Sequence, residues 1–130
     1  MGYFIDRSLG SVILPRLLRE DAWQVVTMDE RYGPDRSQAI ADSEWIEGMA
    51  QLDEIALTSD KKIGKVPIQA EAIRRSSARI LVIDANLTAR GQASRLIGNR
   101  GGIERLVSSR PGPWVISLGV GSMHELRIRP

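Results

Sequence analysis

Short apolar runs alternate along the chain with segments in which apolar residues recur at helical spacing. Five runs favour β-strands by their length and their content of β-branched and aromatic residues, at residues 3–5, 24–28, 54–58, 79–83 and 114–118. The segments between them place apolar side chains three and four positions apart, at residues 14–18, 42–51, 67–76 and 88–97. This alternation predicts an α/β fold, in which right-handed βαβ units build a mainly parallel sheet flanked by helices.

Helix-capping and helix-breaking residues set the expected ends of these segments. Asp42 and Thr88 each suit the capping position of a helix. Residues 29–37 contain Gly-Pro-Asp and are expected to form a loop. Residues 99–102, which contain Gly101-Gly102, are expected to interrupt the last helical segment and to leave a further helical turn or two over residues 102–108.

Aspartates recur at the ends of the expected strands. Asp6 follows the first strand, Asp60 the third and Asp84 the fourth, while Asp42 stands at the start of a helix. Ligands bind outside the carboxyl ends of the strands in open parallel sheets, so these side chains are expected to converge on one edge. Each aspartate also has a local alternative: an ion pair with Arg7 for Asp6, a helix cap for Asp42, and turns for Asp60 and Asp84.

Clustered carboxylates repel one another unless a cation lies between them. A hard divalent ion such as Mg²⁺ or Mn²⁺ takes oxygen ligands, activates a bound water and neutralises charge that develops on a phosphodiester. No histidine is needed for such a site, and the single histidine, His124, is near the end of the chain. Ser8 and Ser59 lie beside the acids and are candidates to hold water or phosphate.

Length and composition exclude several classes of protein. The 130 residues fit one domain, 1–130, and the absence of cysteine excludes disulfides, thiolate zinc sites and thiol nucleophiles. No apolar stretch approaches the ~18–20 residues of a membrane helix, and no signal peptide precedes the first strand. The expected location is therefore the cytoplasm, without a membrane partner.

Charge is distributed unevenly along the chain. Residues 1–60 contain 5 basic and 12 acidic residues, whereas residues 61–130 contain 13 basic and 4 acidic residues. Acids that can hold a metal thus come first, and bases that can meet phosphate come later, a pattern that suits a metal-dependent nuclease. The alternative is that folding intermixes the two halves and cancels the asymmetry at the surface.

Three short segments, in this order, carry a family resemblance: FIDRSLG at 4–10, DSEWI at 42–46 and LTSDKKI at 57–63. With them the chain resembles the PIN-like nucleases, and within these the group related to VapC-type toxins. The resemblance implies a three-layer PIN-like fold and an acidic pocket that binds Mg²⁺ or Mn²⁺ and cuts RNA, leaving 5′-phosphate and 3′-hydroxyl ends.

The resemblance also assigns the site residues. Asp6, Asp42 and Asp60 take the acidic, metal-binding positions, and Lys61 matches a basic residue that contacts the scissile phosphate or orients Asp60. Arg7 and Glu44 lie beside matched acids and are candidates to support them. Many PIN domains have a fourth acid soon after the third; residues 61–65 offer none here, so Asp84 or Asp53 would have to replace it.

The function that the resemblance implies is a metal-dependent endoribonuclease, the toxin of a toxin–antitoxin pair. Its partners would be an RNA substrate and an antitoxin protein, and a homodimer is a further expectation. The alternative is a catalytically inactive PIN-like module that binds RNA or protein. A phosphoacceptor receiver domain and a DxD phosphatase fit poorly, because Arg7 follows Asp6 and no lysine follows the fifth strand.

Overall fold

The computed structural model describes residues 1–130 and contains one six-stranded sheet in the order β2-β1-β3-β4-β5-β6. The strands are β1 (Gly2–Ile5), β2 (Gln24–Thr27), β3 (Ile55–Thr58), β4 (Arg79–Val82), β5 (Trp114–Leu118) and β6 (Met123–Leu126). Neighbouring strands are parallel except for β6, which pairs antiparallel with β5. The expected α/β fold with a mainly parallel sheet is confirmed.

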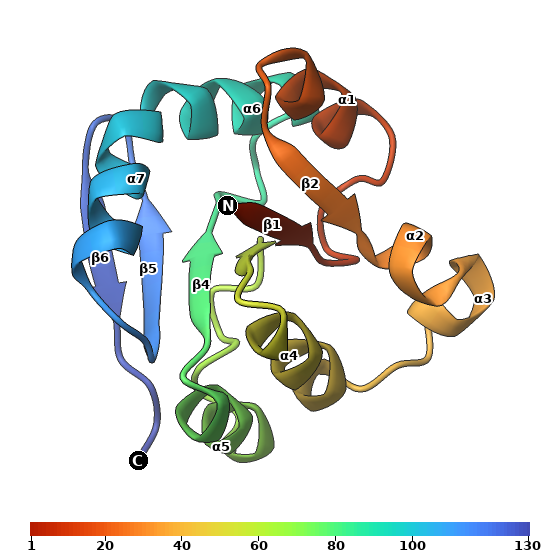
Figure 1. Cartoon of the computed structure of the whole chain (residues 1–130), viewed down its shortest axis with the longest axis vertical. Helices are drawn as coiled ribbons and strands as arrows, with labels where there is room; N and C mark the ends of the chain where they lie inside the picture. The colour runs from red at the N-terminus through yellow and green to blue at the C-terminus, as the bar shows by residue number, and fades with distance from the viewer.

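Helices cover both faces of this sheet, which gives three layers (Figure 1). They are α1 (Ile13–Glu20), α2 (Met28–Tyr32), α3 (Pro34–Ser37), α4 (Asp42–Gln51), α5 (Pro67–Ser76), α6 (Ala89–Gly98) and α7 (Arg100–Ser109). Helices α1, α6 and α7 pack on one face, whereas α2, α4 and α5 pack on the other. None of these helices is long and apolar enough to cross a membrane.

The side chains of each strand alternate between two apolar cores. In β1, Tyr3 and Ile5 point into the core shared with α1, α6 and α7, while Phe4 points into the other core. There it stacks on Trp45 of α4, with ring centroids 5.5 Å apart. This period of two fixes which face each strand residue occupies, so the register of the sheet is strongly specified.

The register also aligns the carboxyl ends of the central strands. Ile5 at the end of β1 pairs with Thr27 of β2 and with Leu57 of β3, and Thr58 pairs with Val82 of β4. Residues that directly follow these strands therefore meet at one edge of the sheet, which we call the carboxyl edge. The opposite edge, where the same strands begin, is the amino edge.

The expectation of a loop over residues 29–37 is wrong, because the chain forms two short helices there. Thr27 and Glu30 form a reciprocal capping box at the start of α2, and Pro34 occupies the first turn of α3. Gly33 joins the helices with a φ of +84°, a value that L-residues with a side chain rarely adopt. Local capping residues thus form these two helices, which the pattern of apolar residues did not predict.

Three further expectations differ from the structure. Ala41, not Asp42, is the capping residue of α4, and Asp42 is its first helical residue. The expected interruption is present but lies at Asn99, between α6 and α7, whereas the glycine pair falls inside α7, which runs unbroken from Arg100 to Ser109 with Ile103 buried against the sheet. Strand β6 follows a turn at Gly121 and was not expected. Tertiary packing outweighs the low helix propensity of glycine in α7.

Candidate functional site

Asp6 is the buried centre of the carboxyl edge. Its side chain is only 5% exposed and follows β1 directly. The backbone N–H of Ser8 donates to Asp6 Oδ1 at 2.9 Å, the Ser8 hydroxyl donates to the same oxygen, and the Thr58 hydroxyl donates to Oδ2 at 2.8 Å. Both carboxylate oxygens are thus held in place by neighbouring donors, with no arginine or lysine to balance the charge.

The surroundings of Asp6 make its negative charge costly. Burial raises the pKa of Asp6, and the charge of nearby Asp42 raises it further, while the hydrogen bonds from Ser8 and Thr58 lower it in part. The net result is a pKa above the usual value of an aspartate. Desolvation and a like charge both oppose ionisation, so a cation bound at this point would relieve both.

Asp42 lies close enough to act on Asp6 and is held from both sides. Trp45 Nε1 donates to its Oδ1 at 2.8 Å, and Gln69 Nε2 of α5 donates to its Oδ2 at 2.7 Å. Arg7 Nη1 lies 3.9 Å from Asp42 Oδ1, while the other end of the guanidinium donates to the carbonyl of Ile40. Helices α4 and α5 thus fix the orientation of this carboxylate.

Asp60 is connected to Asp6 through Thr58. The Thr58 hydroxyl that donates to Asp6 also accepts a hydrogen bond from the backbone N–H of Asp60, at 3.1 Å. The Asp60 side chain accepts from the N–H of Lys62 at 2.9 Å through Oδ1, as in a local turn, and its Oδ2 has no protein partner. Asp6 is thus coupled to Asp42 by charge and connected to Asp60 by hydrogen bonds through Thr58.

The side chains do not, however, form a ready-made cage. No three acidic or histidine side chains come close enough together in this structure to hold one metal ion. The strands and helices therefore bring the three aspartates to the carboxyl edge, but the carboxylates of Asp42 and Asp60 accept hydrogen bonds from other residues.

The remaining sequence candidates fall into two groups. Lys61 is exposed and makes no ion pair, and Asp84 is exposed at the carboxyl end of β4, where it accepts from the N–H of Asn86 at 2.9 Å. Glu44 is turned to solvent, with Arg36 at 2.8 Å. Asp53 lies at the amino edge, paired with Arg79, so it cannot replace a fourth acid at the carboxyl edge.

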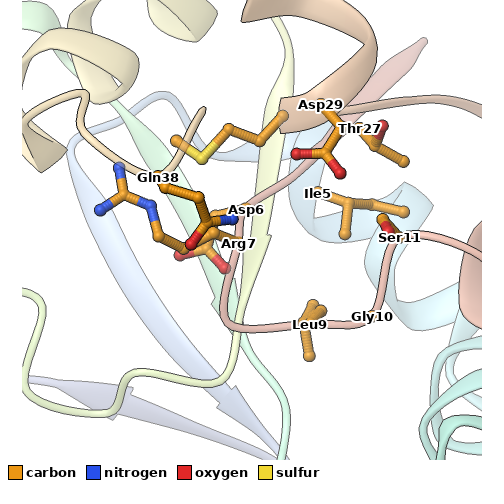
Figure 2. A pocket seen from close by; sticks show the side chains of 10 residues that line it. Ile5, Asp6, Arg7, Leu9, Gly10, Ser11, Thr27, Asp29 and Gln38 are labelled. Carbon is orange, nitrogen blue, oxygen red and sulfur yellow. The ribbon is translucent and has the colours of Figure 1, made fainter. Parts of the chain in front are cut away.

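Sequence reasoning missed several residues of this edge. Thr58 bridges Asp6 and Asp60. Its hydroxyl at the end of an otherwise apolar strand could have indicated that it belongs to the site. Asp29 lies in the first turn of α2, just beyond the end of β2, so the rule of strand ends could have found it; it lines a pocket beside Asp6 together with Gln38 (Figure 2). Nothing in the sequence indicated Gln69, because its contact with Asp42 spans 27 residues.

The chemistry of these side chains fits a hard divalent cation. The donors are carboxylate and hydroxyl oxygens, the ligands that Mg²⁺ and Mn²⁺ prefer. Gln69 Oε1, on the amide that holds Asp42, is buried and has no hydrogen-bond partner. A buried acceptor without a partner is costly, and a water or ion beside it would remove that cost. The residues present therefore suit such an ion.

Comparison with known proteins agrees with this arrangement. Residues 1–85, which include Asp6, Asp42, Asp60 and Lys61, match the family described as "PIN like domain". Over 116 residues the chain is 31% identical to "Putative ribonuclease VapC45" of Mycobacterium tuberculosis, an alignment that covers 88% of this chain and 83% of that protein. No solved structure matches the chain. The chain therefore belongs to the PIN-like domain family, in its VapC-type group.

Proposed function

We propose that this protein is a metal-dependent endoribonuclease and the toxin component of a toxin–antitoxin pair. One observation carries the proposal: a buried aspartate without an ion pair, Asp6, lies at the carboxyl edge beside Asp42 and Asp60. Family membership supports it, because a relative over most of the chain is named as a ribonuclease. A purely structural acid in this position would be expected to have an arginine or lysine partner.

Asp6, Asp42 and Asp60 would hold the metal, which we expect to be Mg²⁺ or Mn²⁺. Such an ion, when bound, supplies an activated water and charge neutralisation at a phosphodiester. The hydroxyls of Ser8 and Thr58 orient Asp6, and Trp45 Nε1 orients Asp42. Rigid ligands of this kind favour a defined coordination geometry over a loose one.

Asp60 is the better placed of the acids to act as general base. Its Oδ2 has no protein partner, whereas both oxygens of Asp42 already accept hydrogen bonds. A free carboxylate oxygen can take the proton from a water that attacks the phosphorus atom in line. The leaving group would be the ribose 3′-oxygen, which gives 5′-phosphate and 3′-hydroxyl ends.

A comparison of three variants tests the proposal. Asp6→Asn and Asp60→Asn are expected to abolish RNA cleavage in Mg²⁺ or Mn²⁺ and to weaken Mn²⁺ binding measured by calorimetry. Asp53→Asn removes the same charge at the amino edge and should leave both unchanged. Cleavage that survives in the first two purified, folded variants would refute the assignment, and a native protein without millimolar Mn²⁺ binding would favour an inactive binding module.

Lys61 is expected to contact the scissile phosphate. It is exposed beside Asp60 and makes no ion pair, so its ammonium group is free for a substrate. Lys61→Ala should reduce cleavage about 10-fold, in line with the loss of one charged hydrogen bond, without changing Mn²⁺ affinity. Lys65→Ala is the matched control, since that lysine is equally exposed four positions away. Equal rates in the two variants would exclude this role.

The antitoxin would be a separate chain encoded beside this one. A neighbouring short reading frame for a DNA-binding protein, whose product copurifies with this chain and blocks cleavage, would support the toxin role. A nuclease that is active in the test tube, yet has no inhibitory neighbour, would retain the cleavage proposal and remove the toxin–antitoxin part.

A further inference from the structure

A pocket opens at the carboxyl edge between β1 and β2, immediately beside Asp6. Its volume is about 190 Å³, below the ~300–1,000 Å³ of pockets that take drug-sized ligands. Figure 2 shows Asp29 with Thr27 on the β2 side, and Asp6 with Arg7 on the β1 side. Its size suits a single ring system rather than a larger ligand.

The lining of the pocket combines apolar surface with polar groups that have no partner. Ile5, Leu9 and Met28 supply the apolar part. Asp29 Oδ1 accepts from the Ser37 hydroxyl, which fixes the carboxylate, while Oδ2 has no protein partner. The side-chain amide of Gln38 makes no hydrogen bond within the protein, although it also lines the pocket. One free acceptor and one free amide thus face the same space.

We propose that this pocket receives the base of a nucleotide next to the scissile phosphate and selects bases with an exocyclic amino group. The proposal rests on the proposed nuclease function, because Asp6 belongs to both the pocket and the candidate metal site. RNA bases splayed out of a single strand are read through hydrogen bonds to their edges. Asp29 and Gln38 are the reading residues.

The selectivity follows from what each group can accept or donate. An ionised carboxylate only accepts hydrogen bonds, so Asp29 Oδ2 is satisfied by a donor and repels a carbonyl. Adenine, cytosine and guanine each present an amino group, whereas uracil replaces it with a carbonyl. The amide of Gln38 both donates and accepts, as glutamine does when it pairs with adenine. Uracil offers Asp29 only its N3–H, and the two carbonyl oxygens that flank this donor would be repelled by the carboxylate, so a uridine should bind less tightly.

The position of Arg7 links the pocket to the cleavage site. Arg7 lines the pocket and also lies 3.9 Å from Asp42 Oδ1, so its guanidinium lies between the base site and the second acid. A nucleotide with its base in the pocket would thus have its phosphate near both Arg7 and Asp6. Planar guanidinium groups bind phosphate oxygens well.

Binding of the four nucleoside monophosphates tests the pocket without metal and without turnover. Titrations followed by NMR should shift the signals of Gly10, Ser11 and the Gln38 side-chain amide with AMP, CMP or GMP at lower concentrations than with UMP. Asp29→Asn should reduce this preference about 10-fold or more, the worth of one hydrogen bond to a charged group. Asp35→Asn removes a charge from the neighbouring helix α3 and should retain the preference.

Absence of these shifts with every nucleotide, or equal affinity for all four, would overturn the proposal. Cleavage of RNA with randomised bases, read by sequencing the new ends, separates it from the proposed function. A native protein that cuts RNA with the same base profile as Asp29→Asn and Gln38→Ala would refute the pocket and keep the nuclease. A native protein that cuts nothing, yet binds amino-bearing nucleotides here, would refute the nuclease and keep the pocket.

Discussion

The two edges of the sheet use acidic residues in opposite ways. At the amino edge, acids that precede the strands are matched with arginines. These pairs are Glu54 with Arg31 at 2.6 Å, Asp53 with Arg79 at 2.7 Å and Asp21 with Arg100 at 3.0 Å. At the carboxyl edge, acids that follow the strands have no ion pair at all: Asp6, Asp29, Asp60 and Asp84.

The difference separates acids that stabilise the fold from acids that are available to a ligand. The Arg31–Glu54 pair is bidentate and its guanidinium lies 5.0 Å from the centre of the Phe4 ring, so it ties α2 to the start of β3. Asp6 is more deeply buried than either partner of that pair, yet it has no ion-pair partner. Perturbed, unpaired acids of this kind are typical of functional sites.

Among variants that test this difference between the edges, Asp42→Asn is expected to have the largest effect on RNA cleavage. RNA cleavage should fall by more than about 100-fold, because residues that merely orient metal ligands are already worth about 10- to 100-fold. The pKa of Asp6 should also fall, since the charge of Asp42 raises it. Glu44→Gln is the control, an exposed acid on the same helix. Equal cleavage by the two variants would show that the carboxyl edge has no special role.

Gln69→Ala should weaken Mn²⁺ binding by about 10- to 100-fold, because the amide that orients Asp42 is lost. The free energy of unfolding without metal should change by less than about 1 kcal/mol, the worth of one ordinary hydrogen bond. Calorimetric titration and urea unfolding measure the two quantities. Gln51→Ala, on the exposed end of α4, should change neither. A loss of stability with unchanged metal affinity would make Gln69 a structural residue only.

At the amino edge the expected effect is on stability alone. Glu54→Gln should lower the free energy of unfolding by about 2 kcal/mol, because it leaves the half-buried Arg31 without its carboxylate. Glu104→Gln removes an exposed partner of Arg100, which retains Asp21, so the free energy of unfolding should stay the same within error. Both variants should cut RNA at the native rate. A large loss of cleavage in Glu54→Gln would contradict the assignment of the amino edge to stability alone.

The smallest effect concerns pH. The pKa of Asp6 is higher in the folded protein than the usual value near 3.9, so its ionisation destabilises the fold at neutral pH. That cost disappears as the pH falls through the folded pKa towards the unfolded one. Mn²⁺ must displace the proton, so stabilisation by Mn²⁺ should shrink over the same range. Melting temperatures with and without Mn²⁺ measure this, and Asp6→Asn should show no such dependence.

Much of this architecture could be predicted from the order of residues. The strands were predictable because they are continuous apolar runs, and Asp6, Asp60 and Asp84 were placed correctly at strand ends by position alone. Residues 29–37 were not, since their helices depend on a capping box and a proline rather than on an apolar stripe. Strand β6 reads MHEL and is largely exposed, so only its pairing with β5 identifies it.

The sequence by itself determined which residues end up at the carboxyl edge, because parallel strands of fixed polarity deliver whatever follows them to the same side. Only the tertiary structure decided which acids remain without an ion pair, how Thr58 and Gln69 hold Asp6 and Asp42, and that a pocket opens beside Asp29. The physical reason is that the position and direction of each strand follow from the residues of that segment. Ion pairs, burial and pockets depend on side chains that are distant in the sequence and meet only after the layers have packed.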